Sequence, residues 1–400
     1  MSGIVIVGAG QAAASMAAKL RSEGYTGAVT VIGDEPCPPY QRPPLSKAYL
    51  LGEMPLERLT LRADEFWTDQ KITMRTATNV QAIDPAARAV TFGGETLGYD
   101  QLALCTGAPA RRLPAAMGGD LPGVFTVREL ADTDAMAPHF QPGKRLVVIG
   151  GGYIGLEAAA VARKLGLSVT VVEAAPRILG RVACAQTADT IRALHIANGV
   201  ILHEGTGVEM LLGQDHVTGV ELSTGEVLPA DLVITGIGVT PATALAQAAG
   251  LAVGNGIVTD SLGRTSDPQI WAAGDCAEIA LDGGRARLES VGNAIDMGEL
   301  VAQNMLGANI AYTPKPWFWS DQFGSKLQIA GWNAGATQII TRAGDGQSFW
   351  YFRDGRLIAV DALDDPRAYM VGKRLIEAAS SVTPEDIADP KVDLKSLMRR

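Results

Sequence analysis

The feature that most constrains the fold of this chain is a pattern that occurs twice. Residues 3–13 read GIVIVGAGQAA and residues 145–155 read RLVVIGGGYIG. In each copy, a short apolar run leads into a G-x-G turn and a stretch with helical spacing. A second apolar run follows, at 28–32 in the first copy and 168–172 in the second. This order predicts two strand–helix–strand units with parallel strands, and therefore an α/β fold.

The small residues of the two turns are those that a bound dinucleotide requires. The first glycine allows a tight turn, the second lets the backbone approach a pyrophosphate, and a third small residue lets helix and strand pack closely. The N-terminus of each helix would then face the phosphates. One G-x-G alone could be a mere turn, but two copies in the right order predict two Rossmann-like dinucleotide-binding domains. The candidate residues are Gly8, Gly10, Ala12 and Ala13 in the first copy, and Gly150, Gly152, Ile154 and Gly155 in the second.

Acidic residues near the second apolar run distinguish the two nucleotides. Glu173 ends this run in the second copy, where a carboxylate binds an adenosine ribose through its hydroxyls and would repel a 2′-phosphate. No cation follows before Arg177, which favours NADH over NADPH. In the first copy the same slot is Gly33, and the displaced acids Asp34 and Glu35 are the candidates. A solvated turn carboxylate is the alternative there.

Length and charge limit the other classes of protein. A chain of 400 residues exceeds what one hydrophobic core usually supports, so two or three domains are expected. The net charge of -9 argues against a nucleic-acid partner, which needs a basic face. The apolar stretch at 232–259 contains a proline and several glycines, so a buried strand, loop and short helix are expected rather than a membrane span.

Cysteine and histidine usage favours a cytoplasmic protein without a metal site. The four cysteines show neither C-x-x-C nor C-x₄-C spacing, and the four histidines show no metal-ligand spacing. No secretory signal is visible at the start of the sequence. Reduced thiols are the simplest account of these cysteines.

Three further segments carry a family resemblance: YQRPPLSK at 40–47, TSDPQIWAAGD at 265–275 and PWFWSD at 316–321. With the two glycine turns, they make the chain similar over nearly its whole length to the FAD-dependent ferredoxin reductases of bacterial oxygenase systems. The resemblance implies a glutathione-reductase-like fold. The FAD domain would comprise 1–112 and 239–315, the NAD domain 113–238, and an α+β C-terminal domain 316–400.

The resemblance also implies roles for individual residues. Lys47 would lie at the N5 and O4 edge of the flavin and stabilise charge on the reduced ring. Glu157 would lie near the nicotinamide, and Asp275 would bind a ribityl hydroxyl of FAD. The other implied cofactor contacts are Arg42, Val80, Thr106, Gly107, Val291, Trp317 and Trp319 for FAD, and Arg181, Gly236, Ile237 and Gly238 for NADH. Structural roles, such as a turn-capping aspartate or two tryptophans filling a core, stay open for these positions.

The activity that follows is hydride transfer from NADH to FAD and then single-electron transfer to a two-iron ferredoxin. Disulfide-reducing relatives carry a C-x₄-C pair after the first strand–helix–strand unit, where this chain has only Cys37. A thiol relay is therefore not expected. The alternatives are a rubredoxin reductase, a single-cysteine NADH oxidase or peroxidase, and an NADH-responsive binding flavoprotein similar to apoptosis-inducing factor. Both a monomer and a homodimer are compatible with the sequence, and the tail from 380 onward is expected either to cover the protein body or to be disordered.

Overall fold

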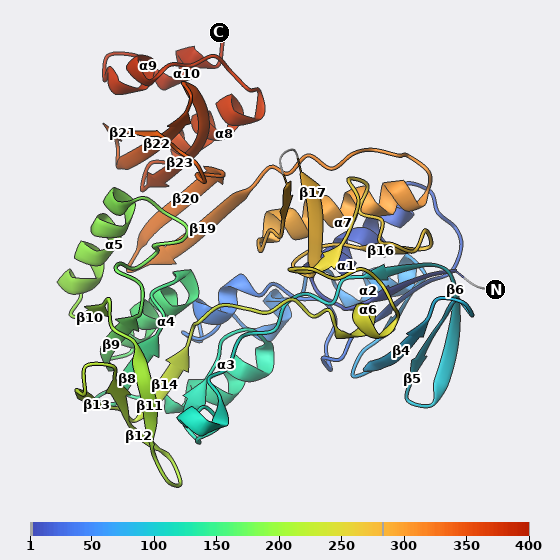
Figure 1. Ribbon diagram of the computed structural model, residues 1–400, viewed down its shortest axis with the longest axis horizontal. Helices are drawn as coiled ribbons and strands as arrows, with labels where there is room; N and C mark the ends of the chain where they lie inside the picture. The colour runs from blue at the N-terminus through green and yellow to red at the C-terminus, as the bar shows by residue number, and fades with distance from the viewer. Residues whose placement is uncertain (1–2, 282–283, 400) are drawn as a thin grey trace. The chain divides into compact units, whose positions relative to one another are not determined.

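The structure is a computed structural model that describes residues 3–281 and 284–399 (Figure 1). The chain divides into two compact units. The first unit comprises Met1–Gln41, Leu56–Pro109 and Val239–Pro316, and the second comprises Arg42–Pro55, Ala110–Gly238 and Trp317–Arg400. Each unit contains one of the two predicted strand–helix–strand copies. The short segment 42–55 groups with the second unit, and the division into an FAD, an NAD and a C-terminal domain stays a prediction.

A seven-stranded sheet is the centre of the first unit. Its strands are β1 (Gly3–Val7), β2 (Val29–Ile32), β3 (Ile72–Arg75), β4 (Val80–Asp84), β5 (Ala89–Phe92), β6 (Glu95–Leu104) and β16 (Ile270–Ala272). Their order is β3-β2-β1-β6-β5-β4, with β16 paired to β6 beside this path. β1 runs parallel to β2 and β6, and β16 runs parallel to β6. The carboxyl ends of β1, β2, β6 and β16 therefore meet at one edge of the sheet.

Helices and a small sheet complete the first unit. They are α1 (Gln11–Ser22), η2 (Leu56–Arg58), α2 (Asp64–Asp69), α6 (Ala244–Ala248), β15 (Ile257–Val258), β17 (Ala277–Leu281), β18 (Gly284–Ala286) and α7 (Val291–Met305). α1 and α7 pack so closely that a Cβ added at Gly298 would lie 2.6 Å from the carbonyl oxygen of Ala12. Small residues on both helices make this approach possible.

The second copy forms an all-parallel sheet in the second unit, in the order β10-β9-β8-β14-β7. An antiparallel sheet, β11-β12-β13, and short helices accompany it. The elements are η1 (Pro43–Ser46), η3 (Ala115–Met117), β7 (Val124–Phe125), α3 (Leu130–Met136), η4 (Ala137–His139), β8 (Arg145–Ile149), α4 (Tyr153–Lys164), β9 (Ser168–Glu173), α5 (Ala185–Ala197), β10 (Ile201–Glu204), β11 (Val208–Gly213), β12 (Val217–Leu222), β13 (Val227–Pro229) and β14 (Leu232–Thr235).

A five-stranded antiparallel sheet, in the order β19-β20-β23-β22-β21, forms the end of the chain with three helices. Its elements are β19 (Trp317–Gln322), β20 (Ser325–Gly331), β21 (Gln338–Ala343), β22 (Gln347–Arg353), β23 (Arg356–Leu363), α8 (Pro366–Glu377), α9 (Pro384–Ala388) and α10 (Leu394–Leu397). α8 packs against β20 and β23, and Trp350 and Phe352 on β22 are fully buried in this core. The expected α+β character of this region is confirmed.

The tail is ordered as far as it is described, so the alternative of a disordered tail is wrong. Ile387, Leu394 and Leu397 are buried in the same hydrophobic cluster as α8. The guanidinium of Arg342 donates hydrogen bonds to four backbone carbonyls between Ile387 and Val392. A mostly polar segment is thus held by its buried apolar side chains and one arginine.

The apolar stretch at 232–259 consists of β14, the short helix α6 and β15, as expected from its proline and glycines. Within the described ranges, every helix is too short or too polar to cross a bilayer.

Candidate functional site

The first glycine of each turn is required by the backbone itself. Gly8 has φ +104°, and a Cβ there would lie 2.1 Å from the carbonyl oxygen of Cys105. Gly150 has φ +109°, and a Cβ there would lie 2.3 Å from the carbonyl oxygen of Gly236. Both residues occupy a left-handed conformation against the end of a neighbouring strand, so no other residue fits. The two copies therefore repeat in geometry as well as in sequence.

The second glycine of each turn is different, because a Cβ at Gly10 or Gly152 would meet no protein atom within 4 Å. Each is the N-cap of its helix, α1 or α4, and neither helix has a side-chain cap. The open space and the uncapped N–H groups fit a pyrophosphate that approaches the bare backbone. Both turns therefore fit the pyrophosphate of a dinucleotide.

The end of the second strand differs between the copies for a steric reason. In the first copy a Cβ at Gly33 would lie 2.4 Å from the Cβ of Ala9, so this slot cannot hold an acid. In the second copy the residue that corresponds to Ala9 is Gly151, and its N–H donates to Glu173 Oε2 at 2.7 Å. Glu173 Oε1 accepts a second hydrogen bond from the N–H of Ala175, also at 2.7 Å. The carboxylate of Glu173 is thus fixed beside the glycine turn, where the sequence predicted a ribose-binding acid.

The displaced acids of the first copy lie after β2. Asp34 is exposed, and its Oδ1 accepts a hydrogen bond from the N–H of Glu35. Glu35 Oε2 accepts a hydrogen bond from the hydroxyl of Tyr40 at 2.5 Å. Glu35 is therefore oriented by Tyr40, whereas the side chain of Asp34 faces solvent.

Three more predicted FAD residues follow strand ends of the same sheet. Thr106 and Gly107 follow β6, and the hydroxyl of Thr106 donates to the carbonyl oxygen of Ala242 at 2.7 Å. Asp275 lies beyond β16, after Gly274, and its carbonyl oxygen accepts a hydrogen bond from Arg287. Since β1, β6 and β16 are parallel, these residues lie at the sheet edge that carries Gly8 and Gly10. This is the edge where nucleotides bind in α/β sheets.

Val80 and Val291 also belong to the first unit. Val80 begins β4 and is buried, and Val291 is the first residue of α7. The hydroxyl group of Tyr312 donates to Asn293 Oδ1 at 2.8 Å and helps to hold the start of α7.

The predicted NADH residues of the second unit also gather at one sheet edge. Gly236, Ile237 and Gly238 follow β14, and the N–H of Gly236 donates to the carbonyl oxygen of Ile149 at 2.7 Å. A Cβ at Gly238 would lie 3.8 Å from an Nη atom of Arg181, so this exposed guanidinium lies beside the loop. Ile154, in the first turn of α4, is 40% exposed.

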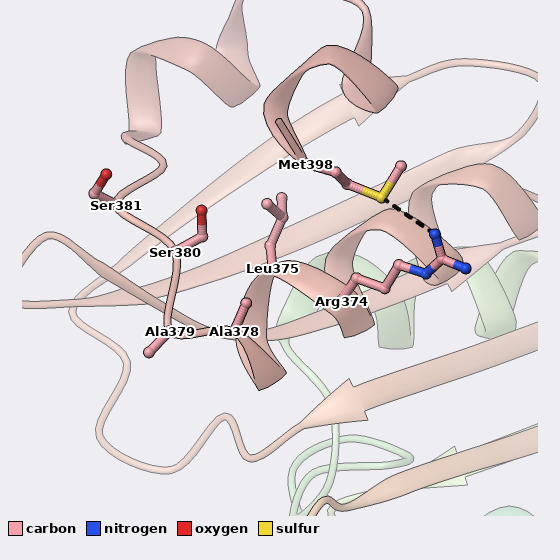
Figure 2. A pocket seen from close by; sticks show the side chains of 7 residues that line it. All are labelled: Arg374, Leu375, Ala378, Ala379, Ser380, Ser381 and Met398. Atoms are coloured by element: carbon pink, nitrogen blue, oxygen red, sulfur yellow. Dashed lines mark hydrogen bonds between the residues drawn. The ribbon is translucent and has the colours of Figure 1, made fainter. Parts of the chain in front are cut away.

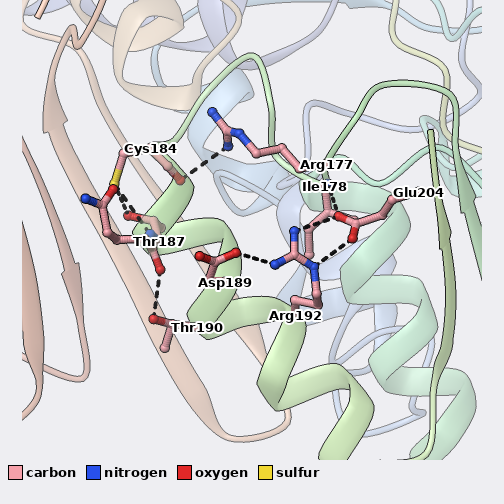
Figure 3. Close-up of polar contacts among 9 residues, drawn as sticks. Arg177, Ile178, Cys184, Thr187, Asp189, Thr190, Arg192 and Glu204 are labelled. Carbon is pink, nitrogen blue, oxygen red and sulfur yellow. Dashed lines mark hydrogen bonds and ion pairs between the residues drawn. The ribbon is translucent and has the colours of Figure 1, made fainter.

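The loop between β9 and α5 is held by charged side chains (Figure 3). Glu204 Oε1 accepts a hydrogen bond from the N–H of Ile178 at 2.6 Å, and Arg192 pairs with both Glu204 and Asp189. The guanidinium of Arg177 donates to the carbonyl oxygens of Cys184 and Gly180. Arg177, the one cation close after Glu173 in sequence, is thus directed at backbone carbonyls.

Lys47 and Glu157, the two predicted catalytic residues, form an ion pair within the second unit. Lys47 Nζ lies 3.0 Å from Glu157 Oε1, and the Glu157 side chain is only 4% exposed. Lys47 follows η1, which packs against α4, the helix that carries Glu157. Burial raises the pKa of Glu157 above its usual range, although Lys47 and two serine hydroxyls act in the opposite direction.

Two stacked tryptophan rings lie beside the lysine of this pair. Lys47 Nζ lies 5.4 Å from the ring centre of Trp319, and Asp321 Oδ2 lies 3.5 Å from the same ammonium. Trp319 stacks on Trp317 with ring centres 5.5 Å apart, and Lys373 lies over Trp317. Both tryptophans are half-buried, so they form the edge of the site rather than a closed core. Arg42, at the start of η1, donates to the carbonyl oxygen of Arg128 at 2.7 Å.

Four residues that contact this pair directly or through one another were not predicted from the sequence. The hydroxyls of Ser46 and Ser320 each donate to Glu157 at 2.6 Å. Behind Ser320 lie Gln322 and then His195, which is fully buried on α5. Ser320 and Gln322 alternate on β19 with both side chains buried, and such polar alternation in a strand is the signal that could have identified them.

No disulfide joins the four cysteines, all of which lie in the described ranges. Cys105, Cys184 and Cys276 are buried, and burial raises the pKa of Cys105 and Cys276. Both thiols therefore stay protonated and unreactive. Cys37 is half-buried and lies in the first unit.

A cavity of about 490 Å³ lies near the C-terminal end of α8 (Figure 2). Arg374, Ser380, Ser381 and Met398 are among its lining residues, and Arg374 contacts the sulfur of Met398. None of the predicted site residues lines it. The cavity therefore plays no part in the candidate site.

Comparison with known proteins agrees with this geometry. Residues 2–298 match the family described as pyridine nucleotide-disulphide oxidoreductase, and residues 317–398 match the reductase C-terminal family. A ferredoxin–NAD(P)⁺ reductase of Sphingomonas sp is 44% identical over 99% of this chain and 97% of its own length. Putidaredoxin reductase of Pseudomonas putida is 39% identical over 99% of this chain and 96% of its own length.

Solved structures match equally well. A covalent putidaredoxin reductase–putidaredoxin complex superposes with a TM-score of 0.96 at 38% identity, covering 100% of this chain and 98% of that chain. A ferredoxin reductase from Rhodopseudomonas palustris gives 0.95 at 39% identity, with 99% of both chains covered. The predicted fold class and enzyme class are confirmed, and so is the use of FAD with NAD(P)H, while the preference for NADH stays a prediction. The chain belongs to the pyridine nucleotide-disulphide oxidoreductase family and carries the reductase C-terminal domain.

Proposed function

We propose that this protein is an NADH-dependent ferredoxin reductase of a bacterial oxygenase system. The balanced reaction is NADH plus two oxidised ferredoxins giving NAD⁺, two reduced ferredoxins and one proton. The observation that carries the proposal is the pair of open glycine turns at Gly10 and Gly152, which fit two dinucleotides in one chain. Relatives named as ferredoxin reductases, among them the ferredoxin–NAD(P)⁺ reductase and the biphenyl dioxygenase system reductase, support the choice of acceptor.

The residues of the first unit would hold FAD. Gly8 and Gly10 would open the start of α1 to the pyrophosphate, Glu35, held by Tyr40, would bind the ribose, and Asp275 follows the strand end beside them. When bound, FAD supplies the exchange between a two-electron hydride donor and a one-electron acceptor. The polypeptide itself binds the cofactor, orients it and excludes water.

The residues of the second unit would hold NADH. Gly150 and Gly152 admit the pyrophosphate, and Glu173 is placed to accept hydrogen bonds from the adenosine ribose hydroxyls. A 2′-phosphate would meet this carboxylate with like charge, while Arg177 is directed at the carbonyls of Gly180 and Cys184. These contacts support NADH as the preferred donor.

Lys47 and Glu157 would act where the redox chemistry takes place. Lys47 offers an ammonium that stabilises developing negative charge, and Glu157 holds its position at 3.0 Å. The buried carboxylate also balances the charge of the ammonium before negative charge develops beside it. Trp319 covers this ammonium, and its rigid ring limits access of water from the outer side.

The test is a reduction assay of the purified yellow holoprotein. NADH and NADPH are compared as donors, with a two-iron ferredoxin, rubredoxin, glutathione disulfide and oxygen as acceptors. Fast turnover with NADH and the ferredoxin, and slow turnover with the other acceptors, is expected. Faster reduction of rubredoxin would replace the proposed acceptor, and turnover with glutathione disulfide would contradict the proposal.

Cys37 provides a discriminating control, because an oxidase or peroxidase alternative depends on its thiol. Ferredoxin reduction by Cys37→Ser is expected to equal that of the wild type. If Cys37→Ser loses the reduction of oxygen or peroxide and also loses the reduction of ferredoxin, the single-cysteine enzyme is favoured. Slow reoxidation by every ferredoxin, combined with NADH-dependent dimerisation, would favour the binding flavoprotein.

A further inference from the structure

A chain of hydrogen bonds leads from the Lys47–Glu157 pair to a buried histidine. Glu157 Oε1 accepts from the hydroxyl of Ser320 at 2.6 Å, and Ser320 Oγ accepts from Gln322 Nε2 at 2.9 Å. Gln322 Oε1 lies 2.7 Å from His195 Nε2. All of these side chains except Lys47 are at least nine-tenths buried, so the chain is closed to bulk water.

The direction of every bond in this chain follows from the charge of Glu157. An ionised carboxylate only accepts hydrogen bonds, so Ser320 must donate to it. Ser320 Oγ then needs a donor behind it, which is the amide nitrogen of Gln322. The amide oxygen of Gln322 therefore faces His195, and His195 must present Nε2–H. His195 Nδ1 has no hydrogen-bond partner among the described residues, so nothing else selects its tautomer.

Protonation of Glu157 would reverse the direction of every hydrogen bond between Glu157 and His195. The new O–H would donate to Ser320, and Ser320 would donate to the amide oxygen of a flipped Gln322. The amide nitrogen would then donate to His195 Nε2, and His195 would carry its proton on Nδ1. The tautomer of His195 and the ionisation of Glu157 are linked through two side chains that cannot satisfy both arrangements at once.

We propose that His195 is a positioning residue for the reductase, because its Nε2–H fixes Gln322 and Ser320 as the donors that keep Glu157 ionised beside Lys47. This inference rests on the proposed function of the Lys47–Glu157 pair. It gives a role to a buried histidine that lies outside both glycine turns. It also explains why β19 directs the polar side chains of Ser320 and Gln322 into the interior.

Few other charged groups can change the ionisation of Glu157 in this chain of hydrogen bonds. From the elements packed against α4, the charged side chains are Lys47 after η1, Asp321 on β19, Arg145 on β8 and Glu173 on β9, and only Lys47 acts on the pKa of Glu157. On α4 itself the other titratable side chains are Tyr153, Arg163 and Lys164, and none of them acts on the pKa of Glu157.

On α5, which carries His195, and on β10, which packs against α5, the titratable groups are Asp189, Arg192, His203 and Glu204, and Asp361 on β23 bonds to Thr187 of α5. None of them acts on its pKa, which burial lowers and Gln322 raises. His195 is therefore expected to be neutral.

The first test is NMR of the holoprotein labelled with ¹⁵N-histidine, which distinguishes the two neutral tautomers from imidazolium. The His195 signal is assigned as the one missing in His195→Gln. It is expected to show Nε2–H when Glu157 is ionised and Nδ1–H as the pH falls through the titration of Glu157. In Glu157→Gln, which is uncharged, the tautomer should not change with pH. A His195 that keeps one tautomer throughout, or that becomes imidazolium, would overturn the proposal.

The second test measures the pH profile of flavin reduction by NADH in the absence of any ferredoxin. Removing one donor to a carboxylate raises its pKa by about one unit, so Ser320→Ala should shift the apparent pKa upward by that amount. His195→Leu removes only the donor to Gln322 and should shift it in the same direction by less. His195→Gln retains an N–H donor and should restore the wild-type profile. An unchanged profile in Ser320→Ala, a mild substitution, would contradict the proposal even if His195→Leu failed to fold.

Ser46→Ala is the matched control, because Ser46 donates to the same carboxylate but lies outside the chain. His195→Leu should add a further shift in the Ser46→Ala background and none in the Ser320→Ala background. Equal shifts in both backgrounds would mean that His195 acts by packing alone. Both tests omit the acceptor protein, so a wrong assignment of ferredoxin would leave their outcome intact, and a failure here would leave ferredoxin reduction unaffected.

Discussion

Lys47 Nζ and Glu157 Oε1 are 3.0 Å apart, although the two residues lie on different elements and Glu157 is buried. Removing one partner of a buried ion pair leaves an uncompensated charge, which costs far more than losing an exposed pair. The pair therefore has a structural role beside the functional one that we propose, and the two roles can be separated by experiment.

Lys47→Met is expected to lower the free energy of unfolding by about 3–5 kcal/mol at high pH. The pKa of Glu157 is already raised by burial and would rise further without Lys47. A raised folded-state pKa means that stability is lost as the pH rises through it, so the deficit should shrink at low pH. Guanidinium unfolding followed as a function of pH measures this.

Two variants control for this effect. The double variant Lys47→Met with Glu157→Gln should recover most of the stability, because no buried charge remains. Lys164→Met breaks the exposed pair with Glu53 and should cost less than about 1 kcal/mol. A pH-independent deficit in Lys47→Met would mean that Glu157 stays neutral in the wild type.

The sequence predicted the parts of the molecule that depend on local chemistry. The two strand–helix–strand units and their glycines follow from patterns within about thirty residues of each other. Ser46 and His195 could not be found in this way, because Ser46 meets Glu157 and His195 meets Gln322 only through the fold, across 111 and 127 residues of sequence. Sequence spacing tests His195 only as a metal ligand, because nothing in the sequence shows that it is buried beside a glutamine.

Substitutions at the glycine turns should separate folding from nucleotide binding. Gly8→Ala and Gly150→Ala place a Cβ against a carbonyl at positive φ and should prevent normal folding of their unit. Gly10→Ala and Gly152→Ala place it in open space, so both proteins should fold.

Gly10→Ala should be isolated with little bound flavin, whereas Gly152→Ala should retain flavin and show a raised KM for NADH. Flavin absorbance per polypeptide and steady-state kinetics measure the two effects. The two variants serve as controls for each other. Equal flavin content in both would contradict the assignment of FAD to the first turn.

Asp361 provides a prediction for the pH dependence of stability in the C-terminal sheet. Its side chain is fully buried, accepts hydrogen bonds from Thr187 and Tyr351 through Oδ2, and has no partner for Oδ1 among the described residues. Burial raises its pKa to about 6. Its contribution to stability is therefore present below the ordinary pKa of an aspartate and is lost as the pH rises through 6.

Relative to Asp361→Asn, the wild type should lose about 2–3 kcal/mol of unfolding free energy between about pH 4 and pH 8. Asp231→Asn is a control of opposite sign, since hydrogen bonding to Arg145 lowers the pKa of Asp231 to about 2. There the wild type should gain unfolding free energy relative to Asp231→Asn as the pH rises from about 2 to the ordinary aspartate pKa of 3.8, by a smaller amount because the pair is partly exposed. A constant difference between the wild type and Asp361→Asn would show that this aspartate does not titrate in the folded protein.

The coenzyme preference should depend on the contact between Glu173 and the glycine turn. Glu173→Ala combined with Ala174→Arg removes the carboxylate that repels a 2′-phosphate and adds a cation that binds it, so the ratio of kcat/KM for NADH over NADPH should fall by at least about tenfold. Glu173→Gln is the matched control, because it removes the charge but keeps a side chain of the same size beside the N–H of Gly151. It should lower the same ratio less than the double variant does, since it adds no cation. If the ratio stays unchanged in the double variant, Glu173 serves only to hold the N–H groups of Gly151 and Ala175, and the preference for NADH originates elsewhere in the second unit.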